Sequence, residues 1–450
     1  MKALGVLPLV MLLSACVPAS EPEVATRASL NEGSLPPMKT FAGSTPVAPI
    51  RSNNDLALDF VELAFRMESG TELPVLTRFE TPITLRVTGS PTGTLRPDLR
   101  LLVSRLRREA GIDISLTDKP DANITIEAVS RAEIRRVLPQ AACFVAPNVT
   151  SLAEYRSARR QPRTDWTRMT RRERLAIFLP NDASPQEARD CLHEELAQAL
   201  GPLNDLYRLP DSVFNDDNIH AVLTGFDMLM LRATYAPELH NGMSRAEASQ
   251  VIGPLLARLN PRGERSGYGI FPDTSRDWID AMETALTSGS SPAARRQSVE
   301  RAVMIARRFN WGGAREGFSY YALGRLQVGH DSAAALAAFN RADAIYSASA
   351  LMQIHAAHIA VQKAAFTLSA GDAIGTIKLA EAAIPVAARH QNAALLATLM
   401  MFKAEALDLQ GDSVAAEALR VDSLGWARYG FGSDANVRDR LAEIRGLRPF

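Results

Sequence analysis

Apolar residues between Pro185 and Leu200 recur with the period of about 3.6 residues that marks an amphipathic helix. They would form one continuous arc made of Ala188, Cys191, Leu192, Leu196, Ala199 and Leu200. Ser184 and Glu187 have the spacing of a capping box, Pro185 suits the first turn, and Gly201 suits a left-handed stop. The pattern therefore predicts a helix over residues 185–200.

One carboxylate interrupts this apolar arc. Glu195 falls inside it, while Glu194 and Gln198, four residues apart, line one edge. A buried carboxylate costs free energy unless a metal, a hydrogen-bond donor or a proton accompanies it. Glu195 therefore belongs either to a hydrogen-bond network that serves the structure or to a functional site.

The sequence before this helix alternates between strand and helix patterns. Ile83, Leu85 and Val87 predict one strand, and Ile124 and Ile126 predict another. Between them lies a helical stripe that ends at a glycine, formed by Leu99, Leu102, Val103, Leu106, Ala110 and Gly111. An α+β domain is expected.

The C-terminal region, residues 276–450, is expected to be a domain built from helical repeats. Its signal is three dipeptides at equivalent points, spaced 41 and 40 residues apart: His330-Asp331, Gly371-Asp372 and Gly411-Asp412. The segment Tyr321-Ala322-Leu323-Gly324 resembles the first helix of a tetratricopeptide repeat. A generic solenoid of helical hairpins is the alternative. Such an array would bind proteins or peptides, or its helices would only buttress the first domain.

The N-terminus has the features of a lipoprotein signal peptide. Lys2 precedes an apolar run that ends in Leu13-Ser14-Ala15-Cys16, a lipobox. Residues 1–16 are thus predicted to be a signal peptide in which Cys16 is lipidated, and Val17 favours the outer membrane. Residues 17–52 are rich in proline, serine and threonine and predict a flexible tether. No later stretch is apolar enough to span a bilayer.

Two cysteines remain once Cys16 carries lipid. In an oxidising periplasm, Cys143 and Cys191 predict one disulfide, and two separate buried thiols are the alternative. A zinc site at this pair is disfavoured, since two thiols alone do not complete a coordination shell.

The predicted helix also resembles the zinc-binding helix of metzincin proteases. Where that pattern has His, Glu, His, Gly and His, this chain has Glu194, Glu195, Gln198, Gly201 and Asn204. Downstream, Ser212-Val213-Phe214 is similar to the Ser-Ile-Met turn beneath the metal of matrixins, with phenylalanine in place of methionine. Residues 223–235 are similar to the closing matrixin helix, which Thr224 and Asp227 would cap.

A second resemblance covers about Asn53 to Pro261. Residues 60–70 and 76–83 resemble the opening of the domain of unknown function 2927 family. These secreted bacterial proteins look like divergent zincins. The resemblance implies a degenerate zincin-like domain over residues 53–261 and implies no defined activity.

The residues at the metzincin ligand positions suit zinc poorly. Oxygens from Glu194, Gln198 and Asn204 would suit a hard cation better, or these side chains would hydrogen-bond directly. His193, His220 and His240 do not have ligand spacing and are expected to be structural or solvated. Which cofactor the chain takes, if any, stays unknown at this point.

Charge narrows the set of partners. Fifty basic residues balance fifty acidic ones, which argues against nucleic acid. Eight arginines lie within residues 156–174. They would bind phosphate, lipid headgroups or an anionic polymer, or would form a solvated surface loop.

These observations predict a periplasmic, lipid-anchored envelope protein. In the leading hypothesis, a metzincin-like scaffold without catalytic activity lies beside a protein-binding solenoid. The competing hypothesis is a metallopeptidase in which Glu195 acts as general base on metal-bound water. A purely structural envelope component is the third.

Overall fold

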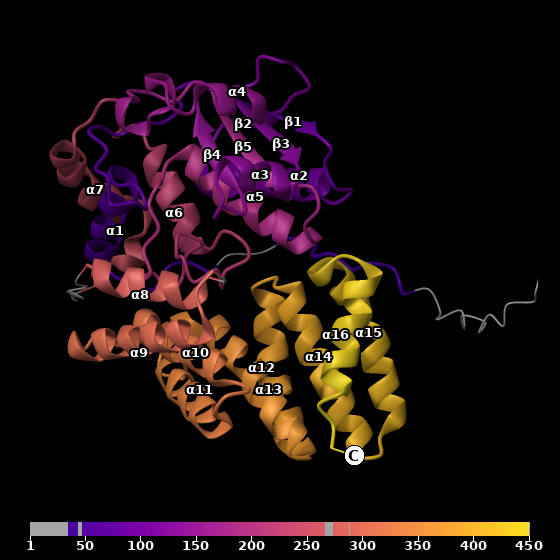
Figure 1. Ribbon diagram of the computed structural model, residues 1–450. Helices are drawn as coiled ribbons and strands as arrows, with labels where there is room; N and C mark the ends of the chain where they lie inside the picture. The colour runs from indigo at the N-terminus through magenta and orange to yellow at the C-terminus, as the bar shows by residue number, and fades with distance from the viewer. Residues whose placement is uncertain (1–34, 44–46, 266–272, 288, 450) are drawn as a thin grey trace, which may run out of the picture. The chain divides into compact units, whose positions relative to one another are not determined.

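The computed structural model describes residues 35–43, 47–265, 273–287 and 289–449 (Figure 1). Cys16 and the predicted signal peptide lie outside these residues. Within the described segments, no helix is both long and apolar enough to cross a membrane.

Helices and strands alternate in the N-terminal domain, as the sequence predicted. Its elements are α1 (Asn53–Phe65), β1 (Ile83–Gly89), α2 (Leu95–Arg105) with a π-helical extension (Leu106–Ala110), β2 (Ile114–Leu116), β3 (Ile124–Val129), α3 (Arg131–Val137), β4 (Phe144–Pro147), α4 (Leu152–Ala158), β5 (Leu175–Pro180), α5 (Pro185–Leu200), α6 (Gly225–Thr234) and α7 (Arg245–Leu259). The two predicted strands are β1 and β3, and the predicted helical stripe forms α2 and its extension, which ends at Gly111 in the left-handed region.

The five strands form one mixed sheet in the order β2-β1-β3-β5-β4. All neighbours pair in parallel except the edge strand β4, which runs antiparallel to β5. Every residue of β5 is buried. A strand that is covered on both faces has no polar alternation, so the sequence pattern did not reveal it.

Helices cover both faces of this sheet (Figure 1). Leu175, Ile177 and Leu179 of β5 face the larger core, which contains α2, α5 and α6. Ala176 and Phe178 face a smaller core, to which α3 and α4 contribute. The helix carrying the candidate site is therefore packed on a rigid sheet.

Helix α5 has the bounds that the sequence predicted, and two details of its ends differ. Ser184 accepts a hydrogen bond from the backbone N–H of Glu187, but the carboxylate of Glu187 pairs with Arg131 and does not complete the box. Gly201 has φ −176°, so it is extended and not left-handed. A side chain there would meet the methyl group of Thr234 at 3.1 Å, and this close approach accounts for glycine.

The C-terminal region consists of packed helix pairs, in agreement with the repeat prediction. Its helices are α8 (Arg276–Leu286), α9 (Pro292–Arg308), α10 (Gly313–Gln327), α11 (Ser332–Ser347), α12 (Gln353–Ser369), α13 (Ala373–Arg389), α14 (Ala393–Leu409), α15 (Ser413–Phe431) and α16 (Asp434–Arg445). Successive helices from α8 to α15 pack against their neighbours.

The three aspartates of the repeated dipeptides are N-caps. Asp331, Asp372 and Asp412 accept hydrogen bonds from the backbone at the starts of α11, α13 and α15. Gly324 of the tetratricopeptide-like segment lies against the ring of Phe339, where a Cβ would approach to 2.5 Å. The repeat signal thus marks helix starts and one tight helix crossing.

Several buried contacts join the helical region to the N-terminal domain. The side-chain amide of Gln186 on α5 donates to Asn392 at 3.0 Å, and the oxygen of the same amide accepts from the backbone N–H of Ala394 at 2.9 Å. Tyr429 of α15 donates to Asp98 of α2 at 2.7 Å. Part of the segment predicted to be a tether also packs on α15, where Phe41 stacks on Trp426.

Candidate functional site

The candidate site is built on α5 and the loop that follows it. A disulfide joins Cys143, just before β4, to Cys191 of α5, which confirms the predicted pairing. The bond fastens α5 to the edge of the sheet and indicates an oxidising compartment outside the cytoplasm.

A buried arginine holds the C-terminal end of α5. Arg172 donates to the carbonyl oxygens of Gln198 and Gly201, and its Nε donates to Thr77 at 3.2 Å. Burial lowers the pKa of Arg172 to about 10, so the group remains a cation at neutral pH. A cation at this position suits the negative end of the helix dipole and supplies a donor to the carbonyl oxygens of Gln198 and Gly201. The other arginines of the dense segment are exposed, as expected for a solvated surface.

The three predicted metal ligands have different surroundings. Gln198 donates to Asp205 at 3.2 Å, and Asn204 donates to the backbone carbonyl of Glu62 at 3.0 Å. Glu194 is partly exposed at the edge of α5. The amide of Asn204 thus ties the end of α5 to α1, next to the backbone bond from Leu203 to Leu63.

Glu195 lies inside the apolar arc, as its position in the sequence predicted. Glu195 is only 5% exposed, and its Oε2 has no hydrogen-bond partner among the described residues. Burial, reinforced by the nearby charges of Asp205 and Glu68, raises the pKa of Glu195 to about 8. Glu195 therefore carries a proton at neutral pH.

Two aspartates that the sequence reasoning missed complete an acidic cluster, defined here as Glu194, Glu195, Asp205 and Asp216. Burial, followed by the charges of Glu194 and Asp216, raises the pKa of Asp205 well above its ordinary value. Burial also raises the pKa of Asp216 to about 7. Asp205 directly follows the motif and could have been noticed, whereas Asp216 lies in a loop without periodicity.

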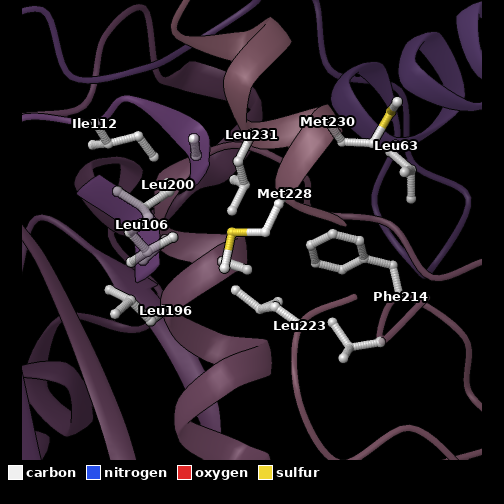
Figure 2. Close-up of a cluster of buried hydrophobic side chains, with 14 of the residues drawn as sticks. Leu63, Leu106, Ile112, Leu196, Leu200, Phe214, Leu223, Met228, Met230 and Leu231 are labelled. Carbon is white, nitrogen blue, oxygen red and sulfur yellow. The ribbon is translucent and has the colours of Figure 1, made fainter. Parts of the chain in front are cut away.

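The turn that resembles the Ser-Ile-Met turn has an apolar floor, defined here as Phe214 and the buried residues around it. Phe214 is fully buried in the core to which α5 contributes, and it lies near Leu223 and Met230 (Figure 2). Leu196 and Leu200 of α5 contribute to the same cluster. The phenylalanine is therefore part of the same apolar core as α5.

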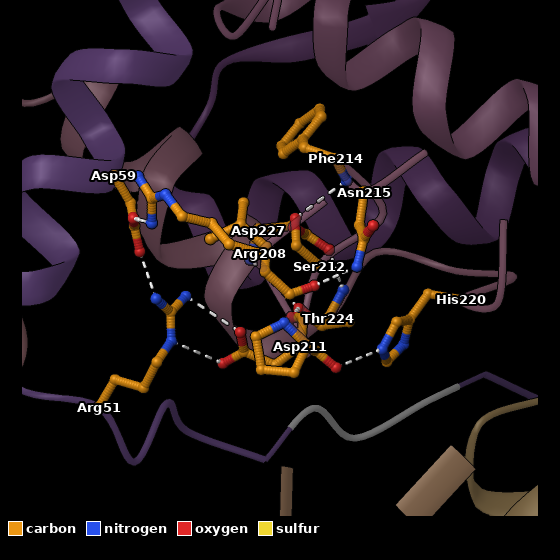
Figure 3. A network of polar contacts seen from close by, with 12 residues as sticks. Arg51, Asp59, Arg208, Asp211, Ser212, Phe214, Asn215, His220, Thr224 and Asp227 are labelled. Atoms are coloured by element: carbon orange, nitrogen blue, oxygen red, sulfur yellow. Dashed lines mark hydrogen bonds and ion pairs between the residues drawn. The ribbon is translucent and has the colours of Figure 1, made fainter. Parts of the chain in front are cut away.

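Polar contacts fix the loop around Phe214 (Figure 3). Ser212 bonds to Asp227 and accepts from the Phe214 backbone at 2.9 Å, while Thr224 donates to the Asp211 carbonyl at 2.6 Å. Thr224 and Asp227 form the capping box of α6 that the sequence predicted. Arg51 pairs with Asp59 and Asp211 at the outer end of this network.

His193 has a structural role, as expected. It is 5% exposed, and its Nδ1 accepts a hydrogen bond from the backbone of Leu223 at 3.1 Å. Burial lowers its pKa well below the ordinary value, so the ring is neutral. His193 thus links α5 to the start of α6.

The described residues contain no group of three histidine, cysteine, aspartate or glutamate side chains arranged to hold a metal ion. Residues 53–253 match the family model described as Protein of unknown function (DUF2927). The DUF2927 domain thus contains the sheet, α5, the acidic cluster and the floor, and it leaves the C-terminal helices outside. No curated protein and no solved structure matches the chain.

Proposed function

We propose that this chain is a lipid-anchored envelope protein in which a non-catalytic, zincin-like DUF2927 domain supports a helical region that binds proteins or peptides. One observation carries the first half of the proposal. Gln198 and Asn204, at two former ligand positions, donate hydrogen bonds to Asp205 and to the Glu62 backbone. These bonds give both amides a structural purpose.

The protonation of Glu195 supports the same reading. A general base must be able to lose its proton near the working pH, and a carboxyl group must be deprotonated to bind a metal. With its pKa raised to about 8 by burial, Glu195 is neutral at pH 7. It therefore resembles a neutral core residue more than an ionised catalytic carboxylate.

Exposed apolar side chains on the helical region support the second half of the proposal. Ile374 and Val414 are 73% and 85% exposed, and each stands two residues after an N-cap aspartate of the repeat. Equivalent placement in two repeats offers a partner a regular pair of apolar anchors.

A competing function rests on the unpartnered oxygen of Glu195. A cation entering the acidic cluster would pair with Oε2, lower the pKa of the carboxylate and restore a general base. In that case the protein would be a hydrolase whose metal is held by Glu194 and its neighbours.

Metal analysis of the purified protein separates these two functions. We expect no stoichiometric zinc, calcium, manganese or iron by mass spectrometry, and no change of melting temperature with chelator. Glu187→Gln, at a half-buried position of the same helix where the carboxylate pairs with Arg131, is the control for Glu194→Gln. A stoichiometric metal that is lost in Glu194→Gln and kept in Glu187→Gln would refute the scaffold proposal.

Binding through the repeats has its own test. Partners crosslinked in an envelope fraction should be lost in the double variant Ile374→Asp/Val414→Asp. They should be retained in Leu58→Asp, which changes an apolar residue of α1 that is 58% exposed. Equal capture by both variants would show that these helices do not bind through the two anchors.

A further inference from the structure

Four of the seven histidines gather where the loop 209–223 meets the helical region. They form the histidine cluster: His220 of the loop, His355 and His358 of α12, and His390 at the end of α13. The ring centroid of His220 lies 5.7 Å from that of His355 and 5.6 Å from that of His390. Residues remote in sequence are thus concentrated at one contact between the DUF2927 domain and the repeats.

The cluster has few hydrogen-bond partners. His355 is fully buried, and its Nε2 lies 3.0 Å from Asp217, which the loop supplies. Nδ1 of His355 and Nε2 of His358 are buried without a hydrogen-bond partner in the described residues. His220 places its Nε2 3.0 Å from the carbonyl oxygen of Pro210 (Figure 3).

The loop docks here through both polar and apolar contacts. Asp217 also accepts hydrogen bonds from the side chain of Asn215 and the backbone of Ile219, so its carboxylate has a fixed orientation. Ile219 is 4% exposed and packs among apolar residues of α12, α13 and α14. Separation of the loop from α12 would break the His355–Asp217 contact and expose Ile219.

The charged neighbours can neutralise one imidazolium, but not four. Asp217 is the carboxylate in contact with His355, and Asp211, which acts on His220, is already paired with Arg51. Two positive charges also act on the cluster, those of Arg325 on α10 and Arg389 on α13. The rings of Tyr346 and Tyr321, on α11 and α10, contribute no charge at neutral pH.

Burial, followed by the neighbouring histidines, therefore opposes protonation. It lowers the pKa of His358 to about 4 and that of His390 to about 3, and it also lowers the pKa of His220. A free histidine gains its proton near pH 6.5. Contact between loop and helices thus loses stability as the pH falls below that value, because the separated state binds the protons more readily.

We propose that the histidine cluster is an acid-sensitive latch, which holds the loop 209–223 against α12 and α13 at neutral pH and releases it in acid. The release is local, since the bonds from Gln186 to Asn392 and Ala394 contain no titratable group and keep the helical region attached. The latch is independent of the proposed function, because it requires neither a metal nor a partner.

Hydrogen exchange measured by mass spectrometry on the intact protein tests the latch. After correction for intrinsic rates, we expect exchange in residues 209–223 to rise at least about tenfold between about pH 7.5 and about pH 5. Exchange in α3 should not change. The double variant His358→Gln/His390→Gln should lose most of the rise, whereas the exposed His330→Gln should keep it.

Two results would overturn the latch. One is equal protection of the loop at both pH values, and the other is an unchanged acid response in the double variant. If that variant does not fold, imidazole titration of the wild-type protein by NMR decides the question. Four independent titrations near pH 6.5, without coincident loop exchange, would refute the proposal.

Discussion

The acidic cluster and the histidine cluster each gather like titratable residues at buried or half-buried positions, but a change of pH in opposite directions ionises them. In the acidic cluster, burial raises the pKa of Glu195 to about 8 and that of Asp216 to about 7. In the histidine cluster, burial lowers the pKa of His358 to about 4. Burial therefore favours the neutral form of Glu195 and of His358 in the folded protein near pH 7.

The difference between the clusters lies in where each one is placed. The acidic cluster surrounds one helix inside the DUF2927 domain, so its ionisation opposes folding of that domain. The histidine cluster spans a contact between that domain and the repeats, so its ionisation opposes docking. Ionisation of the acidic cluster thus lowers the stability of the DUF2927 domain as the pH rises. Protonation of the histidine cluster weakens the contact between that domain and the repeats as the pH falls.

Removing the disulfide should cause the largest loss of stability. The loss should affect the domain that contains the acidic cluster and leave the histidine cluster unchanged. Cys143→Ser/Cys191→Ser opens a link between residues 48 apart in sequence. We expect a loss of about 2–4 kcal/mol in the free energy of unfolding, measured with urea. The acid-induced exchange of the loop 209–223 should stay at its wild-type value, and a change there would show that the two clusters are coupled.

Among the losses of stability, that of Arg172→Met should come next, at about 2 kcal/mol, because the buried carbonyl groups of Gln198 and Gly201 lose this donor. Urea unfolding is again the measurement. Arg171→Met is the matched control, since Arg171 is exposed and pairs with exposed Glu173. Equal effects of the two substitutions would contradict a special role for Arg172.

Glu195→Gln should increase the stability of the protein, whereas the two changes above should decrease it. As pH rises above about 4.5, the unfolded chain releases the proton of Glu195 while the folded protein keeps it, so the wild type loses stability. The glutamine variant escapes this loss and should gain up to about 1.4 kcal/mol per pH unit over the wild type between pH 5 and 8. Thermal unfolding at several pH values measures the gain.

The control is Glu187→Gln on the same helix, where the carboxylate pairs with Arg131 outside the acidic cluster. A variant Glu195→Gln that becomes less stable than the wild type at pH 8 would indicate an ionised, partnered Glu195. That result would favour the hydrolase.

Sequence pattern predicted α5 to the residue because capping, proline and apolar spacing agree there. It also predicted β1, β3 and the repeat starts, all of which depend on local signals. It missed β5, because a strand buried on both faces does not alternate, and β2 and β4, because three or four residues carry too little pattern.

The acidic cluster was predicted only in part, and the histidine cluster was not predicted. Glu195 could be placed by helical period, but Asp216 reaches the cluster through a loop fixed by side-chain contacts. His220 and His355 are separated by 134 intervening residues and meet only when the loop docks on α12. Long-range contacts of this kind leave no periodic trace in the chain.

The smallest effect should come from Tyr429→Phe, which tests whether the helical region buttresses the DUF2927 domain. The Tyr429 hydroxyl donates to buried Asp98 at 2.7 Å, and its loss leaves that carboxylate without this donor. Burial already raises the pKa of Asp98, and the substitution should raise it further. We expect a loss of about 1 kcal/mol near pH 7 by urea unfolding.

Tyr155→Phe serves as the control, because the ring of Tyr155 packs on Phe144 within the smaller core of the sheet. The number of unfolding transitions distinguishes two possible arrangements. A single transition displaced by Tyr429→Phe would mean that domain and repeats unfold together, so that α15 stabilises the sheet domain through α2. Two transitions, with only the one for the helical region displaced, would mean that the repeats are a separable module. In that case their exposed apolar anchors would be free to serve a partner.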